Sequence, residues 1–476
     1  MITINNLFEK LDQAKLTRNH YKIVAAAAIG DMLEFYDYFI IGFILAFIVG
    51  PWQLNFSQTA ILLLTAGVGG MLGAFFWGYI ADIMGRRPVM INTILTFSIA
   101  SGIMYFTPEG DWIFLSILRF VVGFGVGGLY VVDLPLVQEF VPSRYRGILG
   151  GVATAFVPMG TLLGSASAAY LTPIIGWRGL FLIGVLPALF TLVVRAWVPE
   201  SPRWLISKGR YEEAAKSINW VTGSNIDVSQ IVACKPGEVA EEVKKVSFVE
   251  IFKYPRSVIT SWLINLCQQT ADYGFTAWAA MVLTLVLQVS GGEAARLFIS
   301  VAFASVIGKW VWAFSSEWLG RRVSGMLMGI GATVFFVVIA LYYNSYWGTV
   351  PVIWLAFMGV FFFMNGGWSV TGPYSSEVWP RHLRATGMGS AYGFGGIGKF
   401  VGPMVLAYFA GSSNLVTPKA TTDAIGPAYT FMAVLMLIVT ITYYFGYETR
   451  NKSIEEIDEM ISGTLIPSEN SPKIKS

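Results

Sequence analysis

The residues best able to do chemistry are charged side chains that lie inside long apolar stretches of the sequence. Asp31, Glu34 and Asp37 follow one another at three-residue steps in the first stretch. On an α-helix such steps drift by about 60° each, so the three carboxylates form one acidic stripe that lipid would not tolerate. Arg119 lies in another stretch, at a depth about 6 Å from that of Asp37, and its side chain can span that gap.

These residues could couple a change of shape to the binding of a proton. A carboxylate beside Arg119 is stabilised as the anion, whereas one moved into an apolar setting is stabilised as the neutral acid. We therefore expect a proton-coupling site made of four residues: Asp31, Glu34, Asp37 and Arg119. The alternative is a permanent structural ion pair.

Two lysines, Lys309 and Lys399, stand near the centres of apolar stretches in the second half of the chain. From the middle of a span, a lysine stem reaches only part of the way to water. Two such cations favour an anionic solute, most simply a carboxylate. Alternatively, each neutralises a buried acid such as Asp272 or Glu34. The remaining candidates for lining a solute cavity are polar or aromatic: Gln268, Gln269, Asp272, Tyr273, Asn365 and Trp368.

The stretches that carry these residues are long enough to cross a membrane. The chain has 476 residues, of which 55% are hydrophobic and 13% charged, whereas soluble domains are about 25% charged. Blocks of about twenty apolar residues can cross about 30 Å of hydrocarbon as helices. We expect an all-α polytopic membrane protein with twelve spans: 22–49, 57–80, 88–107, 112–139, 146–170, 178–198, 256–288, 294–316, 323–343, 349–376, 386–410 and 424–446.

One polar stretch after the sixth span divides the chain into halves. The expected domains are a six-helix bundle over 1–198, a cytoplasmic linker with short helices over 199–255, a second six-helix bundle over 256–449 and a cytoplasmic tail over 450–476. Basic residues precede the first span and follow alternate spans, so the positive-inside rule predicts that both termini are cytoplasmic. This topology is expected in an inner membrane of the bacterial type.

Charged motifs at the helix ends recur in the same order in both halves. GYIADIMGRR follows the second span and AFSSEWLGRR the eighth, and a Glu-x-x-Pro-x-x-x-Arg motif ends the fourth and the tenth. Carboxylates and guanidiniums at helix ends can pair in a partly dry interface. We expect a cytoplasmic gate, although the same charges could serve topology and folding alone. The gate residues are Asp82, Arg86, Arg87, Glu139, Arg146, Glu200, Arg203, Glu317, Arg321, Arg322, Glu377 and Arg384.

These motifs carry a family resemblance. GYIADIMGRR, the Arg119-Phe-Val-Val-Gly-Phe-Gly segment and PESPRWL at 199–205 resemble the major facilitator superfamily, in the branch of sugar porters, organic-ion carriers and metabolite:proton symporters. The resemblance implies alternating access of two bundles around one site. In related sugar:proton symporters an aspartate of the first helix pairs with this arginine, so the resemblance places Asp37 ahead of Glu34 as the proton carrier. Gln268 and Gln269 resemble the paired glutamines of sugar porters.

The region of the eleventh span resembles the organic-acid and organic-ion carriers more closely, since it has Lys399 and a Gly402-Pro403 pair. We weigh this likeness above the glutamines and expect proton-coupled symport of a small organic anion, an aromatic or other carboxylate. The alternatives are a sugar or polyol:proton symporter, an exporter of organic cations or drugs, and a transceptor or non-transporting regulator. No enzyme activity, metal, cofactor or nucleic-acid partner is expected, and the protein is expected to be a monomer in the bilayer.

Overall fold

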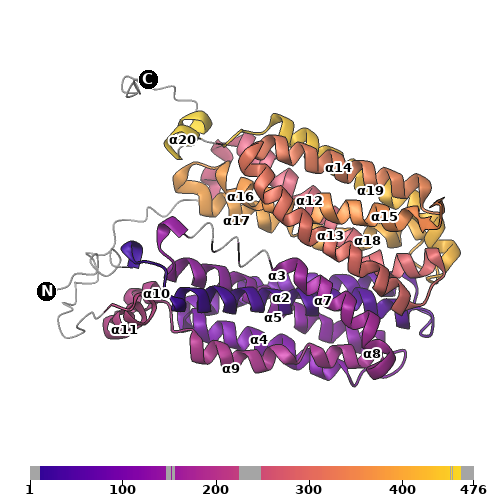
Figure 1. The fold of residues 1–476 in the computed structure, drawn as a ribbon, viewed down its shortest axis with the longest axis horizontal. Helices are drawn as coiled ribbons and strands as arrows, with labels where there is room; N and C mark the ends of the chain where they lie inside the picture. The colour runs from indigo at the N-terminus through magenta and orange to yellow at the C-terminus, as the bar shows by residue number, and fades with distance from the viewer. Residues whose placement is uncertain are drawn as a thin grey trace.

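The computed structural model describes residues 11–145, 149, 152, 156–224, 248–450, 452 and 454–462. Its helices form two groups that lie one above the other in Figure 1. One end carries α10 (Pro202–Ser207), α11 (Tyr211–Thr222) and α20 (Ile454–Ser462), and is called the α11 end. The opposite end, with loops 49–55 and 411–417, is called the far end.

The first group comprises the helices before residue 198. They are α2 (Arg18–Ile48), α3 (Phe56–Met84), α4 (Arg86–Met104), α5 (Trp112–Phe140), the 3-10 turn η1 (Ser143–Tyr145), α7 (Val157–Tyr170), α8 (Thr172–Ile183) and α9 (Leu186–Trp197).

The second group follows the short 3-10 segment η3 (Phe248–Lys253). It comprises α12 (Pro255–Leu287), α13 (Gly291–Trp318), α14 (Arg321–Tyr342), the small antiparallel pair β1 (Tyr346–Trp347) and β2 (Val350–Pro351), α15 (Val352–Val360), η4 (Phe361–Asn365), α16 (Trp368–Glu377), η5 (Arg381–Leu383), α17 (Arg384–Gly395), α18 (Gly398–Ala410) and α19 (Pro418–Phe445).

Local sequence explains where several helices begin and end. Asn55 and Gln58 form a capping box at the start of α3, in which each side chain accepts a hydrogen bond from the other residue's amide. Gly85 separates α3 from α4 with φ of 103°, and Gly320 separates α13 from α14 with φ of 97°. Because this region of φ favours glycine, the repeated GRR motif produces the same tight turn in both halves.

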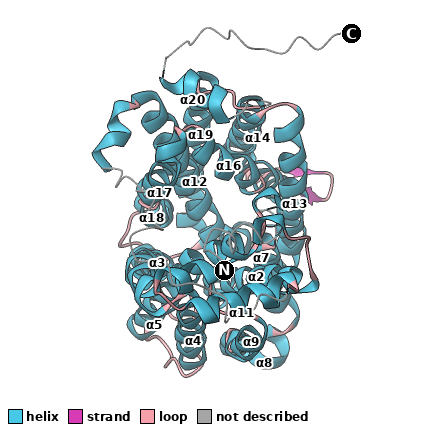
Figure 2. Cartoon of the chain, turned by 90° about the vertical axis from the view of Figure 1, so that its left-hand side faces the viewer, coloured by secondary structure: helices cyan, strands magenta, loops and turns pink. Residues whose placement is uncertain are grey.

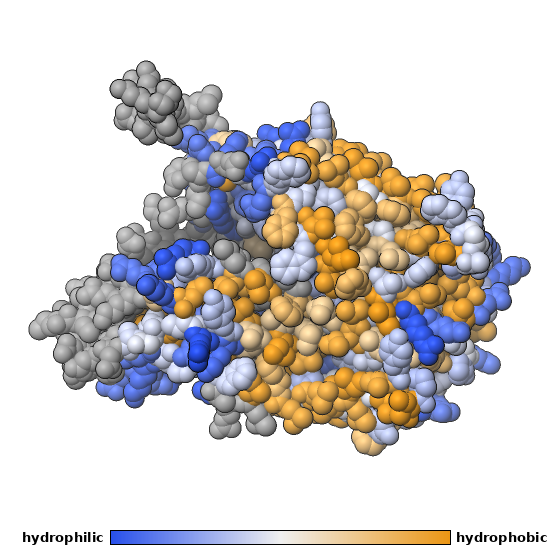
Figure 3. All heavy atoms as spheres, viewed as in Figure 1, coloured by the Kyte–Doolittle hydropathy of each residue, from blue (hydrophilic) through white to orange (hydrophobic). Residues whose placement is uncertain are grey.

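The helices confirm an all-α membrane fold. Among the described residues, eight helices are long and apolar enough to cross a membrane. The other expected spans fall on α2, on α4, on α7 together with residues outside the described part, and on the pair α8 and α9. Apolar residues form a broad band around the middle of the molecule, and polar residues gather at both ends (Figure 3). This distribution matches a slab of hydrocarbon between two aqueous phases.

Three expected spans are interrupted. The span expected over 178–198 breaks at residues 184–185, between α8 and α9, and that over 386–410 breaks between α17 and α18. The span over 349–376 contains the π-helical turn η4 between α15 and α16. Glycines stand at all three breaks, which is where helices most readily deviate from regular geometry.

The two groups meet along their inner faces. α7 packs on α13, α3 on α18 and α2 on α12, and the view along the helices shows α2 and α12 near the centre of the assembly (Figure 2). The described part of the expected linker holds α10, α11 and η3. Residues 225–247 of the expected linker, with Cys234, and the expected tail beyond Ser462 lie outside the described residues.

Candidate solute and proton site

The acidic stripe of α2 is buried within the first group of helices. Asp31, Glu34 and Asp37 are 4%, 3% and 0% exposed. Asp31 lies within hydrogen-bonding reach of the carboxyl group of Asp133 on α5, which is 3% exposed. Glu34 also interacts electrostatically with Asp133. The stripe therefore faces protein and not lipid, as the sequence predicts.

The guanidinium group of Arg119 binds the main chain of α2. Its Nη1 donates to the carbonyl oxygen of Asp37 and its Nη2 to that of Tyr38, both at 2.7 Å. The carboxyl group of Asp37 is directed toward Ser101 and lies against Gly184, which has no side chain to exclude it. The Asp37 carboxyl group and Arg119 interact electrostatically, but the hydrogen bonds of the guanidinium go to the main chain and not to this carboxylate.

Two lysines of the second group face the acidic stripe of the first. The ammonium group of Lys309 on α13 interacts electrostatically with Asp31 and, in its own half, with Asp272. Lys399 on α18 interacts with Glu34. Both lysine side chains are partly buried. Acids of one half and cations of the other thus meet at the interface, where attraction is stronger than in water.

Asp272 organises a polar cluster inside the second group. Its carboxylate accepts hydrogen bonds from Trp368 Nε1 at 2.7 Å, from Asn365 Nδ2 at 3.2 Å and from Thr276 Oγ1 at 3.2 Å. Ser305 in turn donates to Asn365 Oδ1. Three of the expected solute-binding residues, Asp272, Asn365 and Trp368, are therefore brought together, and they satisfy one another.

The two glutamines of α12 have different surroundings. Gln268 accepts from Thr371 Oγ1 at 2.6 Å and donates to the carbonyl oxygen of Met364 at 3.2 Å, so its amide is occupied by the protein. Gln269 is 1% exposed and packs beside Gly395, and its two amide atoms have no hydrogen-bond partner among the described groups. Because an unpaired buried amide is costly, Gln269 is the glutamine better placed to serve a solute.

Lys399 lies beside the ring of Tyr273, which packs against aromatic side chains of the other half. Its Nζ lies 5.1 Å from the ring centre of Tyr273. The Tyr273 ring meets the ring of Tyr38 edge-on at 5.7 Å and lies 6.2 Å from that of Phe39. A cation beside ring faces and edges can bind a flat anion through charge and stacking together.

Two residues of this region are not among the expected site residues. Asp133 is an acid inside the apolar stretch 112–139, and from the sequence it could belong to an exit path for the solute or be solvated. The structure places it beside Asp31. Nothing in the sequence distinguishes Tyr38 as a site residue, since the chain is 15% aromatic and any one ring usually serves in packing. Its place between Arg119 and Tyr273 comes from the packing of α2 against both groups.

The expected gate residues of the first half bind one another at the α11 end. Arg86 pairs with Asp82 at 2.8 Å and with Glu139 at 3.7 Å. Glu200 accepts from the amides of Arg86, at 2.9 Å, and Arg87, at 3.3 Å, and so caps the start of α4. Burial raises the pKa of the Glu200 carboxyl above its usual value, against the opposing effect of these amides. Arg203 adjoins this cluster in sequence, and Arg146 lies outside the described residues.

The second half repeats the arrangement. Arg321 pairs with Glu317 at 2.7 Å and with Glu377 at 3.4 Å. Glu448 accepts from the amides of Arg321, at 3.1 Å, and Arg322, at 3.2 Å, as Glu200 does in the first half. Arg384 donates to the carbonyl oxygen of Trp379. The pairs made by Arg86 and Arg321 each stay within one half, so in this conformation they do not join the two halves.

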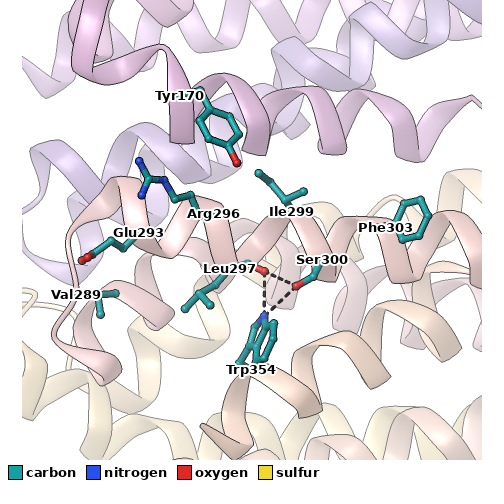
Figure 4. A pocket seen from close by; sticks show the side chains of 9 residues that line it. All are labelled: Tyr170, Val289, Glu293, Arg296, Leu297, Ile299, Ser300, Phe303 and Trp354. Carbon is teal, nitrogen blue, oxygen red and sulfur yellow. Dashed lines mark hydrogen bonds between the residues drawn. The ribbon is translucent and has the colours of Figure 1, made fainter. Parts of the chain in front are cut away.

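A separate hollow of about 610 Å³ lies near the far end, between α7 and α13 (Figure 4). The guanidinium of Arg296 lies 5.7 Å from the ring centre of Tyr170 across the two halves, and Trp354 Nε1 donates to Ser300 Oγ at 3.0 Å. The expected solute-binding residues do not line this hollow. It is therefore distinct from the charged region at the centre.

A helical membrane protein whose halves meet over buried opposite charges has the architecture of a carrier that holds its solute between two bundles. The chain belongs to the family described as sugar (and other) transporter, whose model matches residues 23–461. Because the members of this family are transporters, the expectation that the protein is not an enzyme is confirmed.

Relatives and solved structures agree with this membership. The chain is 27% identical over 458 residues to the niacin transporter NiaP of Acinetobacter baylyi, and the match covers 95% of this chain and 99% of the relative. It is 26% identical to the cis,cis-muconate transport protein of the same organism, over 80% of this chain and 85% of the relative. The inward-open xylose transporter XylE from E. coli matches with a TM-score of 0.71 at 19% identity, over 93% of this chain and 99% of that one, which shows the shared fold.

Proposed function

We propose that the protein is a secondary active transporter that carries a small organic anion, an aromatic or other carboxylate, together with protons by alternating access. The observation that supports it best is the placement of Lys309 and Lys399 at the interface of the halves, with Lys399 beside the ring of Tyr273. A cation on an aromatic wall provides both a partner for a carboxylate and a surface for a flat body. The solutes named for two relatives, niacin and cis,cis-muconate, are organic acids.

The solute carboxylate would take a lysine from its acidic partner. Lys399 interacts with Glu34 and Lys309 with Asp31 when no solute separates them. A bound carboxylate can replace either acid at its lysine without leaving a buried ammonium unpaired, which would be costly. Gln269 and the cluster of Asp272, Asn365 and Trp368 would orient the rest of the solute.

Proton coupling is assigned to the buried acids of α2, Asp31, Glu34 and Asp37, while Arg119 ties α5 to the α2 backbone. A proton that travels with the anion would let a pH gradient drive uptake. The α11 end is proposed to face the cytoplasm of a bacterial-type inner membrane, with the paired charges there acting as the cytoplasmic gate. One chain contains both halves of the site, which supports a monomer as the working unit.

The test is internal pH in proteoliposomes of the purified protein while niacin, cis,cis-muconate, xylose and tetraethylammonium are added outside in turn. We expect acidification of the lumen with one or both carboxylates and none with the cation. Empty liposomes correct for passive entry of the neutral acids, which also acidifies the lumen. The proposal would be contradicted if no carboxylate acidified the lumen faster than it does in empty liposomes.

A sugar:proton symporter is the second candidate, because the unpaired amide of Gln269 could hydrogen-bond a hydroxyl group. The fold match to a xylose transporter is compatible with it. Acidification with xylose alone would favour this candidate and would leave both lysines as partners of Asp31 and Glu34.

A further inference from the structure

We propose that Asp31 of α2 and Asp133 of α5 form a buried carboxyl pair that holds the transported proton, and that Lys309 displaces this proton when the solute leaves. The inference rests on the proposed carboxylate symport. It adds Asp133 to the site and locates the proton at this pair within the acidic stripe.

The placement of the two acids lets them share one proton for as long as no cation compensates a second negative charge. Asp31 and Asp133 come from adjacent packed helices, are 4% and 3% exposed and lie within hydrogen-bonding reach of each other. A carboxylate only accepts hydrogen bonds, so two carboxyl groups can share one only if one of them is protonated. Two bare carboxylates this close, shielded from water, would repel strongly.

The charged groups around the pair decide whether it keeps the proton. Asp31 interacts with Glu34 on its own helix, with Asp133 from α5 and with Lys309 from α13, and Glu34 in turn interacts with Asp133 and Lys399. Among the described residues, Asp133, Glu34 and Lys309 are the charged groups that act on Asp31 directly. Glu34 favours retention of the proton, while Lys309 favours its loss, because a cation stabilises the second carboxylate.

Lys309 belongs to the half that moves relative to the pair. Asp31 and Asp133 are fixed in the first group of helices, and Lys309 reaches them across the interface from the second. A solute carboxylate bound to Lys309 neutralises its charge, so the pair keeps its proton while solute is bound. When the solute leaves, Lys309 turns back to Asp31 and the proton leaves to water. Solute and proton therefore bind cooperatively, and by linkage each raises the affinity for the other by the same factor.

Two measurements on the purified protein test this coupling. The first is calorimetry of carboxylate binding, with niacin or cis,cis-muconate as the probe, whichever of the two acidified the vesicles. The binding enthalpy is measured in two buffers of different ionisation enthalpy, and the difference between them gives the number of protons bound with the solute. The second compares counterflow exchange at equal pH with accumulation driven by a pH gradient in proteoliposomes. The variants are Asp31→Asn and Asp133→Asn.

The matched control is Asp111→Asn, the same change on α5 at its N-cap, where the side chain accepts from the Phe114 amide. We expect wild type and Asp111→Asn to bind about one proton per solute and to accumulate it. Asp31→Asn and Asp133→Asn should bind solute without a proton, retain counterflow and lose accumulation at least tenfold, because an amide imitates the protonated acid.

Three results would overturn the inference. One is accumulation by both variants at the wild-type level. Another is that Asp31→Asn and Asp133→Asn still take up a proton when they bind solute, whereas Asp37→Asn does not. That result would assign the proton to Asp37. The third is loss of counterflow in both variants when each elutes as a single species. Failure of the wild type to carry any carboxylate would instead contradict the proposed function itself.

Discussion

At the scale of single residues, Lys399 makes the most direct prediction about the solute. Lys399→Gln removes a cation that interacts with Glu34 and the Tyr273 ring but keeps most of the side chain's length. A charge-assisted hydrogen bond contributes about 1.5–3 kcal/mol, so carboxylate affinity should fall about 10- to 100-fold, measured by calorimetry.

Lys419→Gln is the matched control for this change, since Lys419 is exposed at the start of α19. It should bind the carboxylate like wild type. Unchanged affinity in Lys399→Gln, in protein with the melting temperature of the wild type, would remove Lys399 from the solute site.

Residue type and depth could be predicted from the sequence, but the partners could not. The acidic stripe of α2 and the two central lysines follow from the cost of placing charge in hydrocarbon, which depends on position along a helix. The binding of Arg119 to the α2 carbonyls, and of Asp31 to Asp133, depends on how α2 and α5 are rotated about their axes. Helical periodicity in one segment does not determine that rotation.

At the scale of elements, the repeated turn between paired helices predicts a shared stabilising contact. Glu200 and Glu448 each accept hydrogen bonds from two amides at a helix start that follows a glycine of positive φ. Glu200→Ala removes the acceptor and should cost about 0.5–2 kcal/mol, seen as a lower melting temperature in detergent. Glu448→Ala should lower it by a similar amount.

Glu200→Gln separates the hydrogen bonds from the charge. Burial raises the pKa of the Glu200 carboxyl, which means that folding disfavours its ionised form. Ionisation of Glu200 therefore adds no stability as the pH rises, and glutamine, which keeps one oxygen acceptor, should retain most of the wild-type stability. A glutamine variant as unstable as the alanine variant would show that the negative charge at the helix start is what matters.

The duplication of these elements was visible in the sequence because GRR motifs and glutamates recur in order. Their role as helix caps was not, because the caps join Glu200 to α4 and Glu448 to α14, which are far apart along the chain. The breaks at η4 and between α17 and α18 were also missed, since hydropathy averages over them.

At the scale of the whole molecule, the far end is closed by the main chain. Phe56 donates to the carbonyl oxygen of Asn414 at 3.0 Å, and Val416 to that of Leu54 at 3.0 Å, so loop 49–55 of one half is bridged to loop 411–417 of the other. Asn55 and Leu415 pair as an antiparallel bridge. The ion pairs of Arg86 and Arg321 at the α11 end each stay within one half, whereas these main-chain hydrogen bonds join the two halves at the far end.

Alternating access requires that this bridge break when the far end opens. Its three main-chain hydrogen bonds, at about 0.5–1.5 kcal/mol each, are a barrier that thermal motion can cross. Asn55→Cys with Leu415→Cys, in a chain whose two native cysteines are replaced by serine, should form a disulfide, because paired residues in such a bridge have suitable spacing. Oxidation should abolish uptake into proteoliposomes, and a reductant should restore it, while each single-cysteine variant transports in both conditions. Full uptake by protein that is shown by mass spectrometry to be crosslinked would mean that the far end stays closed throughout transport, and that the solute enters by another route.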